Sequence, residues 1–265
     1  MEQGDSSEGR ISTQLNDGVF LIGIDRPAKL NGFTPQMLRG MAQAYTAYEH
    51  EGAARCAVVY AEGKHFTAGL DLPKVAPHLG SDSLMVEEGE IDPFDLRAPF
   101  RSKPVVFAVH GICFTLGIEM MLAADIVVAA SDTRFSQLEV KRGLMPTGGA
   151  TIRMVERAGW GNAMRYLLTG DEFDAATALR LGFVQEVVEP GRQLARAMEL
   201  AQHIVRQAPL AVSATIGNAR RALADGPDAA RAVFGKTQRD LLASDDFQEG
   251  LKSFRDKREP GFSGR

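Results

Sequence analysis

Two glutamates stand out because they lie in apolar sequence. Glu119 opens the run EMMLAA, and Glu139, twenty positions later, lies in the run QLEV. Ionised carboxylates are seldom fully buried without partners. One interpretation is structural: Glu119 stabilises a helix N-terminus through the helix dipole, and Glu139 is a partly exposed turn residue. The other is chemical: the pair acts as general acid and base beside free helix N–H groups that bind an oxyanion. Spacing alone favours the structural interpretation.

The stretch 103–149 contains the elements that would position both glutamates. Residues 104–110 are short, rich in valine and bounded by turn residues, which predicts a buried strand. Near Gly117 the sequence changes to residues that form helices well, so a helix should begin there with Glu119 in its first turn. A second strand is predicted at 126–130.

Composition excludes several classes of protein. The chain has 265 residues, of which 45% are hydrophobic and 24% are charged, as expected for a soluble globular protein with a sizeable core. The net charge of −4 argues against a surface that binds nucleic acid or an anionic membrane. No apolar stretch approaches the ~20 residues of a membrane span. Residues 1–10 are polar, lack the apolar part of a signal peptide, and are expected to form a disordered lead-in.

Cysteines and histidines give no sign of a metal site. Cys56 and Cys113 lie in apolar sequence without a partner at metal-ligand spacing, so we expect reduced core residues and a cytoplasmic protein. His65 and His110 are expected to be hydrogen-bonding groups at strand ends rather than catalysts. No G-x-S-x-G motif and no P-loop occurs, which argues against a serine hydrolase and a P-loop enzyme.

Short strands alternate with helices in the first half of the chain. A β-hairpin is predicted at 11–24, where Asp-Gly separates two apolar runs. Thr34 is the predicted N-cap of an amphipathic helix that ends near Glu51. Residues 56–61 form the next predicted strand, and Asp71 is a candidate cap for a short helix.

After residue 76 the chain continues with an acidic segment and then becomes mainly helical. Residues 77–100 show little periodicity and many acidic residues; they are a mobile loop over a cleft or a solvated connection, and the second interpretation is favoured. Helical segments follow Gly149, and a last short strand is predicted at 183–188. After Gly191 only helices are predicted, and a capping box at Asp245 opens the last of them.

These patterns divide the chain into three parts. They are the lead-in 1–10, a mixed α/β part at 11–190, and a helical part at 191–265. The helical part has apolar stripes, for example at Leu194 and Met198, which need the core or a neighbouring subunit to pack on.

Four segments carry a family resemblance. They are DRPAKLNGFT, GKHFTAGLDL, KPVVFAVHGICFTLGIEMMLAADI and FSQLEVKRGLMPTGG. In this order and spacing they resemble the crotonase superfamily, and within it the enoyl-CoA hydratases, from about residue 11 to residue 262. The resemblance implies an α/β fold, a crotonase-like spiral of ββα units followed by a C-terminal all-helical trimerisation region. It also implies self-association as a homotrimer or as a dimer of trimers.

The resemblance further implies a site for an acyl-CoA thioester. The thioester carbonyl would lie between the backbone N–H groups of Leu70 and Leu116, and the two catalytic glutamates of the family would correspond to Glu119 and Glu139. Other positions implied to line the CoA-ester site are Ala28, Lys29, Leu30, Thr67, Ala68, Gly69, Asp71 and Gly117. Coenzyme A would be part of the substrate, so no separate cofactor and no metal are expected.

The sequence departs from the family pattern at one place. Family members commonly have a glycine run before the first glutamate, whereas here Thr115 and Leu116 replace glycines. A leucine is admissible because the oxyanion donor is a backbone N–H. Its side chain must point away from the thioester, and it can narrow the acyl pocket.

The implied reaction is the hydration of a 2-enoyl-CoA thioester to a 3-hydroxyacyl-CoA. The two N–H groups would stabilise an enolate-like oxyanion, Glu139 would protonate the α-carbon, and Glu119 would hold and activate water. Two alternatives stay open: enoyl-CoA double-bond isomerisation, in which one carboxylate shuttles a proton, and a non-catalytic acyl-CoA binder. The presence of both glutamates favours hydration. Glycosidases also use two carboxylates, but a single tryptophan argues against an aromatic sugar cleft.

Overall fold

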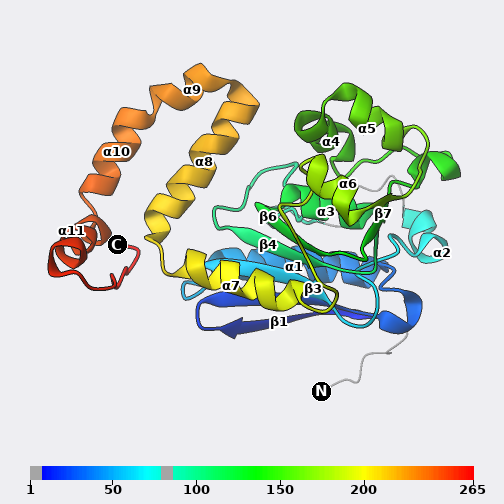
Figure 1. Ribbon diagram of the computed structural model, residues 1–265, viewed down its shortest axis with the longest axis horizontal. Helices are drawn as coiled ribbons and strands as arrows, with labels where there is room; N and C mark the ends of the chain where they lie inside the picture. The colour runs from blue at the N-terminus through cyan, green and yellow to red at the C-terminus, as the bar shows by residue number, and fades with distance from the viewer. Residues whose placement is uncertain (1–7, 79–85) are drawn as a thin grey trace.

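The computed structural model describes residues 8–78 and 86–265 and contains two β-sheets (Figure 1). In the larger sheet, of order β1-β2-β3-β4-β6-β9, the β1–β2 hairpin is antiparallel and the other neighbouring strands are parallel. Its strands are β1 (Arg10–Asn16), β2 (Val19–Asp25), β3 (Cys56–Ala61), β4 (Val105–Val109), β6 (Ile126–Ala130) and β9 (Glu186–Val188). The valine-rich central strands are buried, as is typical of parallel strands covered on both faces. The predicted hairpin and central strands are confirmed.

The smaller sheet, of order β5-β7-β8, shows how the chain repeats. Its strands are β5 (Ile112–Phe114), β7 (Arg134–Ser136) and β8 (Phe173–Asp174). Isolated parallel β-bridges pair Phe33 with Leu70 and Thr67 with Cys113. They link segments that precede β5 in the chain to one another and to β5, by the same kind of parallel pairing as that between β5 and β7. One complete unit is β4, β5 and α3 (Leu116–Ala123), which is a strand in each sheet followed by a helix. The expected spiral of ββα units is confirmed.

Helices cover both faces of the larger sheet. Side chains alternate between the faces along a strand. Val59 therefore packs in the main apolar cluster with α1 (Pro35–His50), whereas Val58 packs on the other face with Ala201 of α7 (Gln193–Val205). The sheet is buried on both sides within a single chain.

Short helices complete the core. They are α2 (Leu72–Val75), α4 (Ala150–Ala158), α5 (Trp160–Leu167), α6 (Ala175–Arg180) and the 3-10 helices η1 (Pro27–Lys29), η2 (Ala76–His78) and η3 (Glu139–Arg142). Figure 1 shows α4, α5 and α6 grouped near α3, on the side of the molecule away from β1. The hydroxyl of Thr34 accepts a hydrogen bond from the amide of Met37, so the predicted N-cap of α1 is confirmed.

The remaining helices form an arm that extends away from the sheets (Figure 1). They are α8 (Pro209–Asp225), α9 (Pro227–Ala232), α10 (Phe234–Leu242) and α11 (Asp245–Asp256). As predicted, only helices follow Gly191 in the described chain; the first of them, α7, packs on the larger sheet through Leu194, Met198 and Ala201. The apolar stripe of α7 belongs to the core, and the arm begins at Pro209.

Two element boundaries differ from those predicted. Ser244 rather than Asp245 is the N-cap of α11, because its hydroxyl accepts a hydrogen bond from the amide of Phe247 at 3.1 Å. β9 begins at Glu186, later than the predicted start at 183. In the described ranges, no helix has the length and apolar character needed to cross a membrane.

The described part of the acidic segment, 86–100, is buried only at Val86 and at 91–94. Val86, Ile91 and Phe94 are buried, and the carboxylate of Asp92 accepts hydrogen bonds from nearby backbone amides. The interpretation as a solvated connection therefore holds for 87–89 and 96–100, which are exposed, and fails for 91–94, which are buried. Residues 79–85 of the segment, and 1–7 of the predicted lead-in, lie outside the described residues.

Candidate active site

Two chain segments meet where the oxyanion donors are predicted. A Cβ atom on Gly69 would clash with the hydroxyl of Thr115, and one on Gly117 would lie 2.5 Å from Cγ2 of Thr67. The segments approach this closely only because both positions are glycine. Gly69 also has a φ of +103°, which glycine adopts without strain. The residues that follow Gly69 and Thr115, which are the two predicted donors, are thus brought together.

The backbone leaves an N–H group available at each donor position. The amide of Phe33 donates to the carbonyl of Gly69 (2.8 Å), and the amide of Asp71 donates to the carbonyl of Phe33 (2.9 Å). In this parallel arrangement the N–H of the intervening Leu70 points to the opposite side. Leu116 is the first residue of α3, where amides have no acceptor within the helix. Both amides can serve an external oxygen; their role as an oxyanion hole stays a prediction.

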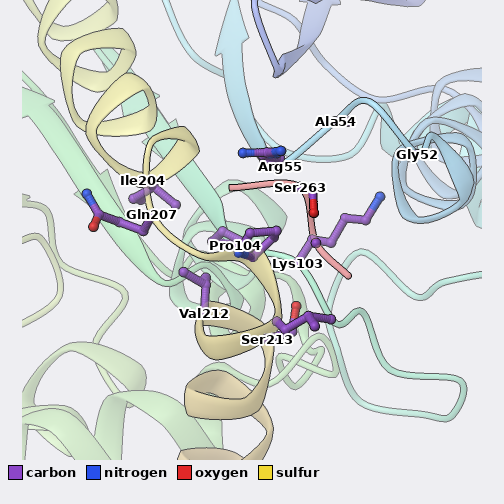
Figure 2. A pocket seen from close by; sticks show the side chains of 13 residues that line it. Gly52, Ala54, Arg55, Lys103, Pro104, Ile204, Gln207, Val212, Ser213 and Ser263 are labelled. Atoms are coloured by element: carbon purple, nitrogen blue, oxygen red, sulfur yellow. The ribbon is translucent and has the colours of Figure 1, made fainter. Parts of the chain in front are cut away.

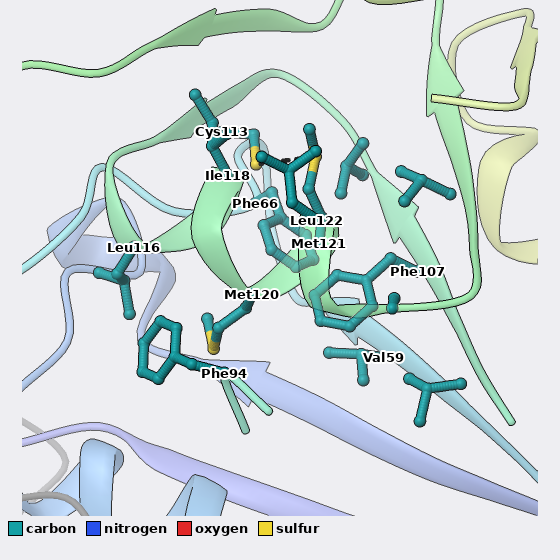
Figure 3. Packing of buried hydrophobic residues seen from close by; sticks show 14 of the residues in the cluster. Val59, Phe66, Phe94, Phe107, Cys113, Leu116, Ile118, Met120, Met121 and Leu122 are labelled. Carbon is teal, nitrogen blue, oxygen red and sulfur yellow. Dashed lines mark hydrogen bonds between the residues drawn. The ribbon is translucent and has the colours of Figure 1, made fainter. Parts of the chain in front are cut away.

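The threonine and leucine at the start of α3 are accommodated differently. The side chain of Leu116 is 4% exposed and lies in the main apolar cluster near Phe94 and Met120 (Figure 3). Thr115 has a φ of +50°, which is strained for a β-branched residue, and its amide donates to the carbonyl of Ser136. A leucine is compatible with a donor at this position because its side chain is buried in the core.

Glu119 is buried against the N-terminus of α4. Its Oε1 accepts hydrogen bonds from the amides of Gly148 (2.7 Å) and Ala150 (3.3 Å), and the residue is 5% exposed. Burial is the main reason that the pKa of Glu119 is raised to about 7; the charge of Glu139 adds to the shift, and the two amides and Arg153 oppose it. The carboxyl group can therefore exchange a proton near neutral pH.

Glu139 is half-buried at the start of η3. Its Oε2 is enclosed and has no hydrogen-bond partner among the described residues, and burial raises its pKa above the ordinary value. The two carboxyl groups are close enough for the charge of Glu139 to raise the pKa of Glu119. The structure thus brings together the pair that the sequence singled out.

A buried glutamine two residues before Glu139 was not identified from the sequence. Gln137 is fully buried, and in the described chain neither its Oε1 nor its Nε2 has a hydrogen-bond partner. The hydroxyl oxygen of Thr115 is buried and unpaired in the same sense. Such groups are rare in native proteins and need an explanation, such as a catalytic role or a bound water molecule. The amide residue within the run FSQLEV is the signal that could have revealed it.

A polar framework fixes the first donor segment, and the sequence did not point to it. Asn31 is fully buried, accepts a hydrogen bond from the amide of Arg26, and donates to the carbonyls of Glu62 and His65. Arg26, itself 5% exposed, forms an ion pair with Asp71 at 2.8 Å. The prediction that the Asp71 side chain caps α2 is wrong, because its carboxylate accepts from Arg26 instead.

The segment predicted to contact the CoA ester lies beside the first donor segment. The amide of Ala68 donates to the carbonyl of Leu30 (2.9 Å), and the amide of Gly69 donates to the hydroxyl of Thr67 (3.0 Å). The exposed residues of the segment are Ala28, Lys29 and Leu30. The predicted positions are therefore neighbours in space, and their contact with coenzyme A stays a prediction.

Other polar groups lie away from this site. A pocket between the core and the arm is lined by Arg55, Lys103 and Ser263, among others, and contains no predicted site residue (Figure 2). Among the described residues, no three His, Cys, Asp or Glu side chains are grouped in the manner of metal ligands.

The cysteines and the two singled-out histidines have the expected structural roles. Cys56 and Cys113 are buried free thiols. Nδ1 of His65 accepts a hydrogen bond from the amide of Ile112, and Nε2 of His110 is hydrogen-bonded to the carbonyl of Gly63.

Comparison with known proteins agrees with this architecture. The family model for enoyl-CoA hydratase/isomerase matches residues 14–265. The chain is 31% identical over 251 residues to enoyl-CoA hydratase EchA19 of Mycobacterium tuberculosis, covering 93% of this chain and 94% of that protein. It is 30% identical over 262 residues to the mitochondrial Delta(3,5)-Delta(2,4)-dienoyl-CoA isomerase of Dictyostelium discoideum, covering 94% and 89%. The crystal structure of a probable enoyl-CoA hydratase/isomerase from Mycobacterium abscessus superposes with a TM-score of 0.93 at 47% identity, covering 96% of this chain and 98% of that one.

Proposed function

The chain belongs to the enoyl-CoA hydratase/isomerase family of the crotonase superfamily, and on that premise we propose that it hydrates 2-enoyl-CoA thioesters to 3-hydroxyacyl-CoA. The observation that carries the proposal is the pair Glu119 and Glu139: the charge of Glu139 acts on Glu119, and burial raises the pKa values of both groups. The similar proteins include one named as a hydratase and one named as an isomerase. Membership therefore supports enoyl-CoA chemistry, and the second carboxyl group supports hydration.

The proposed oxyanion hole consists of the amides of Leu70 and Leu116. Addition of water to the double bond moves negative charge onto the thioester oxygen, and donors fixed in advance stabilise that charge without reorganisation. The N-terminus of α3 adds the positive end of a short helix dipole. One such donor contributes on the order of 10²–10³ to kcat.

The proposed proton transfers divide between the two glutamates. Glu139, whose pKa is raised by burial, would give its proton to the α-carbon. Glu119, held by two backbone amides, would in its ionised form orient and deprotonate the attacking water. The charge of Glu139 raises the pKa of Glu119, which favours a state with one carboxyl group protonated and the other ionised.

Coenzyme A would enter as part of the substrate. The segment of Ala28, Lys29 and Leu30 is exposed next to the Thr67–Gly69 backbone and would bind the CoA portion. We propose no further cofactor, because water, two carboxyl groups and two amides are sufficient for the addition.

Assembly through the arm is the second part of the proposal. The arm exposes large apolar side chains, and exposed apolar clusters mark contact surfaces. The most exposed are those of Leu223, Phe234, Leu251 and Phe254. A homotrimer, or a dimer of trimers, would cover them.

The proposal is tested with purified protein and a series of 2-enoyl-CoA thioesters of increasing chain length, in the presence of chelator. Loss of the enoyl absorbance and formation of the 3-hydroxyacyl-CoA is the expected result. Shift of the double bond in 3-enoyl-CoA thioesters without any hydration would assign the chain to isomerisation instead. Binding of the thioesters without turnover of either kind would make it an acyl-CoA binder.

A further inference from the structure

We propose that Arg153 is a positioning residue for Glu119: it ties segment 92–96 to the Gly148–Ala150 turn, whose amides hold the Glu119 carboxylate. The inference rests on the proposed role of Glu119 as the group that activates water. It goes beyond the two glutamates and two amides described above, because Arg153 touches neither the reacting atoms nor the oxyanion donors.

The Gly148–Ala150 turn must keep a fixed conformation for its amides to bind the Glu119 carboxylate. Gly148 and Ala150 both donate to the same carboxylate oxygen of Glu119. Gly149, between them, has a φ of +104° and is the N-cap of α4. A glycine in this conformation loses much backbone freedom when it is fixed, so the turn depends on its neighbours to keep both amides aimed at Glu119.

Segment 92–96 packs directly on this turn. A Cβ atom on Gly148 would lie 2.7 Å from the Phe94 ring and 2.7 Å from Oε2 of Glu119, and one on Gly149 would lie 3.4 Å from Leu96. Phe94 therefore covers the turn at the place where the turn meets the carboxylate. Asp92 fixes the shape of the segment by accepting hydrogen bonds from the amides of Phe94 (2.9 Å) and Leu96 (3.2 Å).

Arg153 contacts both segment 92–96 and the Gly148–Ala150 turn. Its Nη2 donates to the backbone carbonyl of Asp95 at 3.1 Å, and its Nη1 lies so close to Gly149 that a Cβ atom there would clash with it. Nη1 is buried and has no hydrogen-bond partner within the described residues. The guanidinium thus lies between the segment and the turn, and contacts both.

Contacts from the arm hold the far side of the segment. Arg220 of α8 pairs with the carboxylate of Asp95 at 3.0 Å, and its Nη1 donates to the carbonyl of Arg101. Arg101 in turn binds Asp125 through both terminal nitrogens. Asp95 is therefore fixed between Arg153 and Arg220. We call the contacts that join Arg153, Asp95 and Arg220 the brace; they extend from the turn to the arm.

A half-buried guanidinium whose enclosed Nη1 has no hydrogen-bond partner in the described chain is a costly way to fill space. Burial lowers the pKa of Arg153, and the charges of Asp95, Glu156 and Asp92 oppose this shift. The charge nevertheless faces Glu119 and favours the ionised form of that carboxyl group. A residue serving packing alone would need no charge, so the guanidinium fits a role in setting both the place and the ionisation of Glu119.

The charged groups around these two side chains come from several elements. Those that act on Glu119 include Glu139 of η3 and Arg153 of α4. Those that act on Arg153 include Asp92, Asp95, Arg101 and Glu156.

The test compares Arg153→Met, Arg153→Lys and the matched control Arg157→Met. Arg157 lies one turn further along α4 and donates to the carbonyl of Leu122 rather than to the segment. The titration of Glu119 is followed by infrared difference spectroscopy of the protonated carboxyl band, which Glu119→Gln assigns by removing it. This readout needs no substrate, so it stays informative even if the protein does not hydrate enoyl-CoA thioesters.

In Arg153→Met the midpoint of Glu119 is expected to move to higher pH by about half a unit to one unit, because a nearby positive charge is lost. If the protein is a hydratase, kcat then falls about three- to tenfold below the midpoint while KM is nearly unchanged. Arg153→Lys keeps the charge but not the planar guanidinium that contacts both the segment and the turn, so it should retain the midpoint and still lower kcat. Arg157→Met should change neither the midpoint of Glu119 nor kcat.

A wild-type midpoint in folded Arg153→Met, or an equal shift in Arg157→Met, would overturn the proposal. If Arg153→Met does not fold, Arg153→Lys decides: wild-type kcat in that variant would show that the brace is not needed. Failure of hydration by the unaltered protein would instead refute the proposed function and leave the infrared result to be judged by itself.

Discussion

The core around the two glutamates and the arm differ in how completely they bury apolar side chains. In the core, Leu116 and Met120 are at most 4% exposed and lie in one continuous cluster. In the arm, Leu223 is 75% exposed and Phe254 is 86% exposed. Single exposed apolar residues are ordinary, but several on one set of helices are a feature of contact surfaces. The candidate glutamates thus lie in one core, whereas the arm exposes the apolar side chains that the proposed assembly would cover.

Two neighbouring helices show where this difference begins. α7 and α8 both carry apolar residues, yet α7 packs on the larger sheet, and none of the α8 residues is fully buried. Pro209 opens α8 and separates the two helices. The boundary between core and arm is therefore set by which helix finds a sheet face, not by helical sequence as such.

Truncation of the chain before or after α7 should give the largest difference in folding between two variants. A chain ending at residue 190 lacks α7 and uncovers an apolar sheet face that includes Val58, Val106 and Val128, so it should aggregate. A chain ending at Gln207 keeps α7 and should retain a folded core but fail to self-associate. Circular dichroism and light scattering on purified proteins distinguish these outcomes. A folded, soluble product from the shorter chain would contradict the assignment of α7 to the core.

Substitution of the glutamates should abolish most of the chemistry and leave the core intact. Glu119→Gln and Glu139→Gln are each expected to lower kcat by at least about 10²-fold, since each removes a proton-transfer group. The double variant should lose much less than the product of the two single losses, because the groups act as a unit. Glu189→Gln, at an exposed position directly after β9, is the control and should retain turnover. Near-wild-type kcat in either single variant would remove that residue from the site.

Two substitutions of Leu116 distinguish the role of its backbone N–H from the role of its side chain. Leu116→Ala keeps the N–H but opens a cavity in the core, so it should cost about 2–5 kcal/mol of stability and change chain-length preference. Leu116→Pro removes the N–H as well; because proline is tolerated at the first helical position, α3 can still form. The additional loss in kcat relative to Leu116→Ala should be on the order of 10²–10³. Equal turnover by the two folded variants would mean that the oxyanion donor lies elsewhere.

The smallest expected effect is on the pH dependence of stability. The pKa of Glu119 is raised in the folded protein from the ordinary value of 4.5 to about 7. The folded state therefore holds this proton more tightly than the unfolded state, and its stabilising effect, present below pH 4.5, is lost as the pH rises toward 7. The effect is about 1.4 kcal/mol for each unit of pKa difference. Denaturant unfolding at several pH values should show a shallower decline in Glu119→Gln, and an unchanged decline would contradict the raised pKa.

The sequence by itself determined the local elements, because the interactions that decide them join residues near in the chain. The Asp-Gly hairpin, the Thr34 cap and the position of Glu119 in the first turn of α3 all follow from backbone conformations and hydrogen bonds within a few residues. The candidate pair of glutamates was also visible, because a carboxylate in apolar sequence needs a partner or a function.

The tertiary structure alone decided which groups meet. Glu119 receives its hydrogen bonds from the amides of Gly148 and Ala150, which no local pattern connects to it. Asp71 has a suitable position to cap α2, but the buried guanidinium of Arg26 takes its carboxylate. Periodicity shows that a helix has an apolar face and does not show what that face will cover. The unpaired Gln137, the brace through Arg153 and the place of α7 on the sheet all depend on contacts between residues distant in the chain, and only the folded structure specifies them.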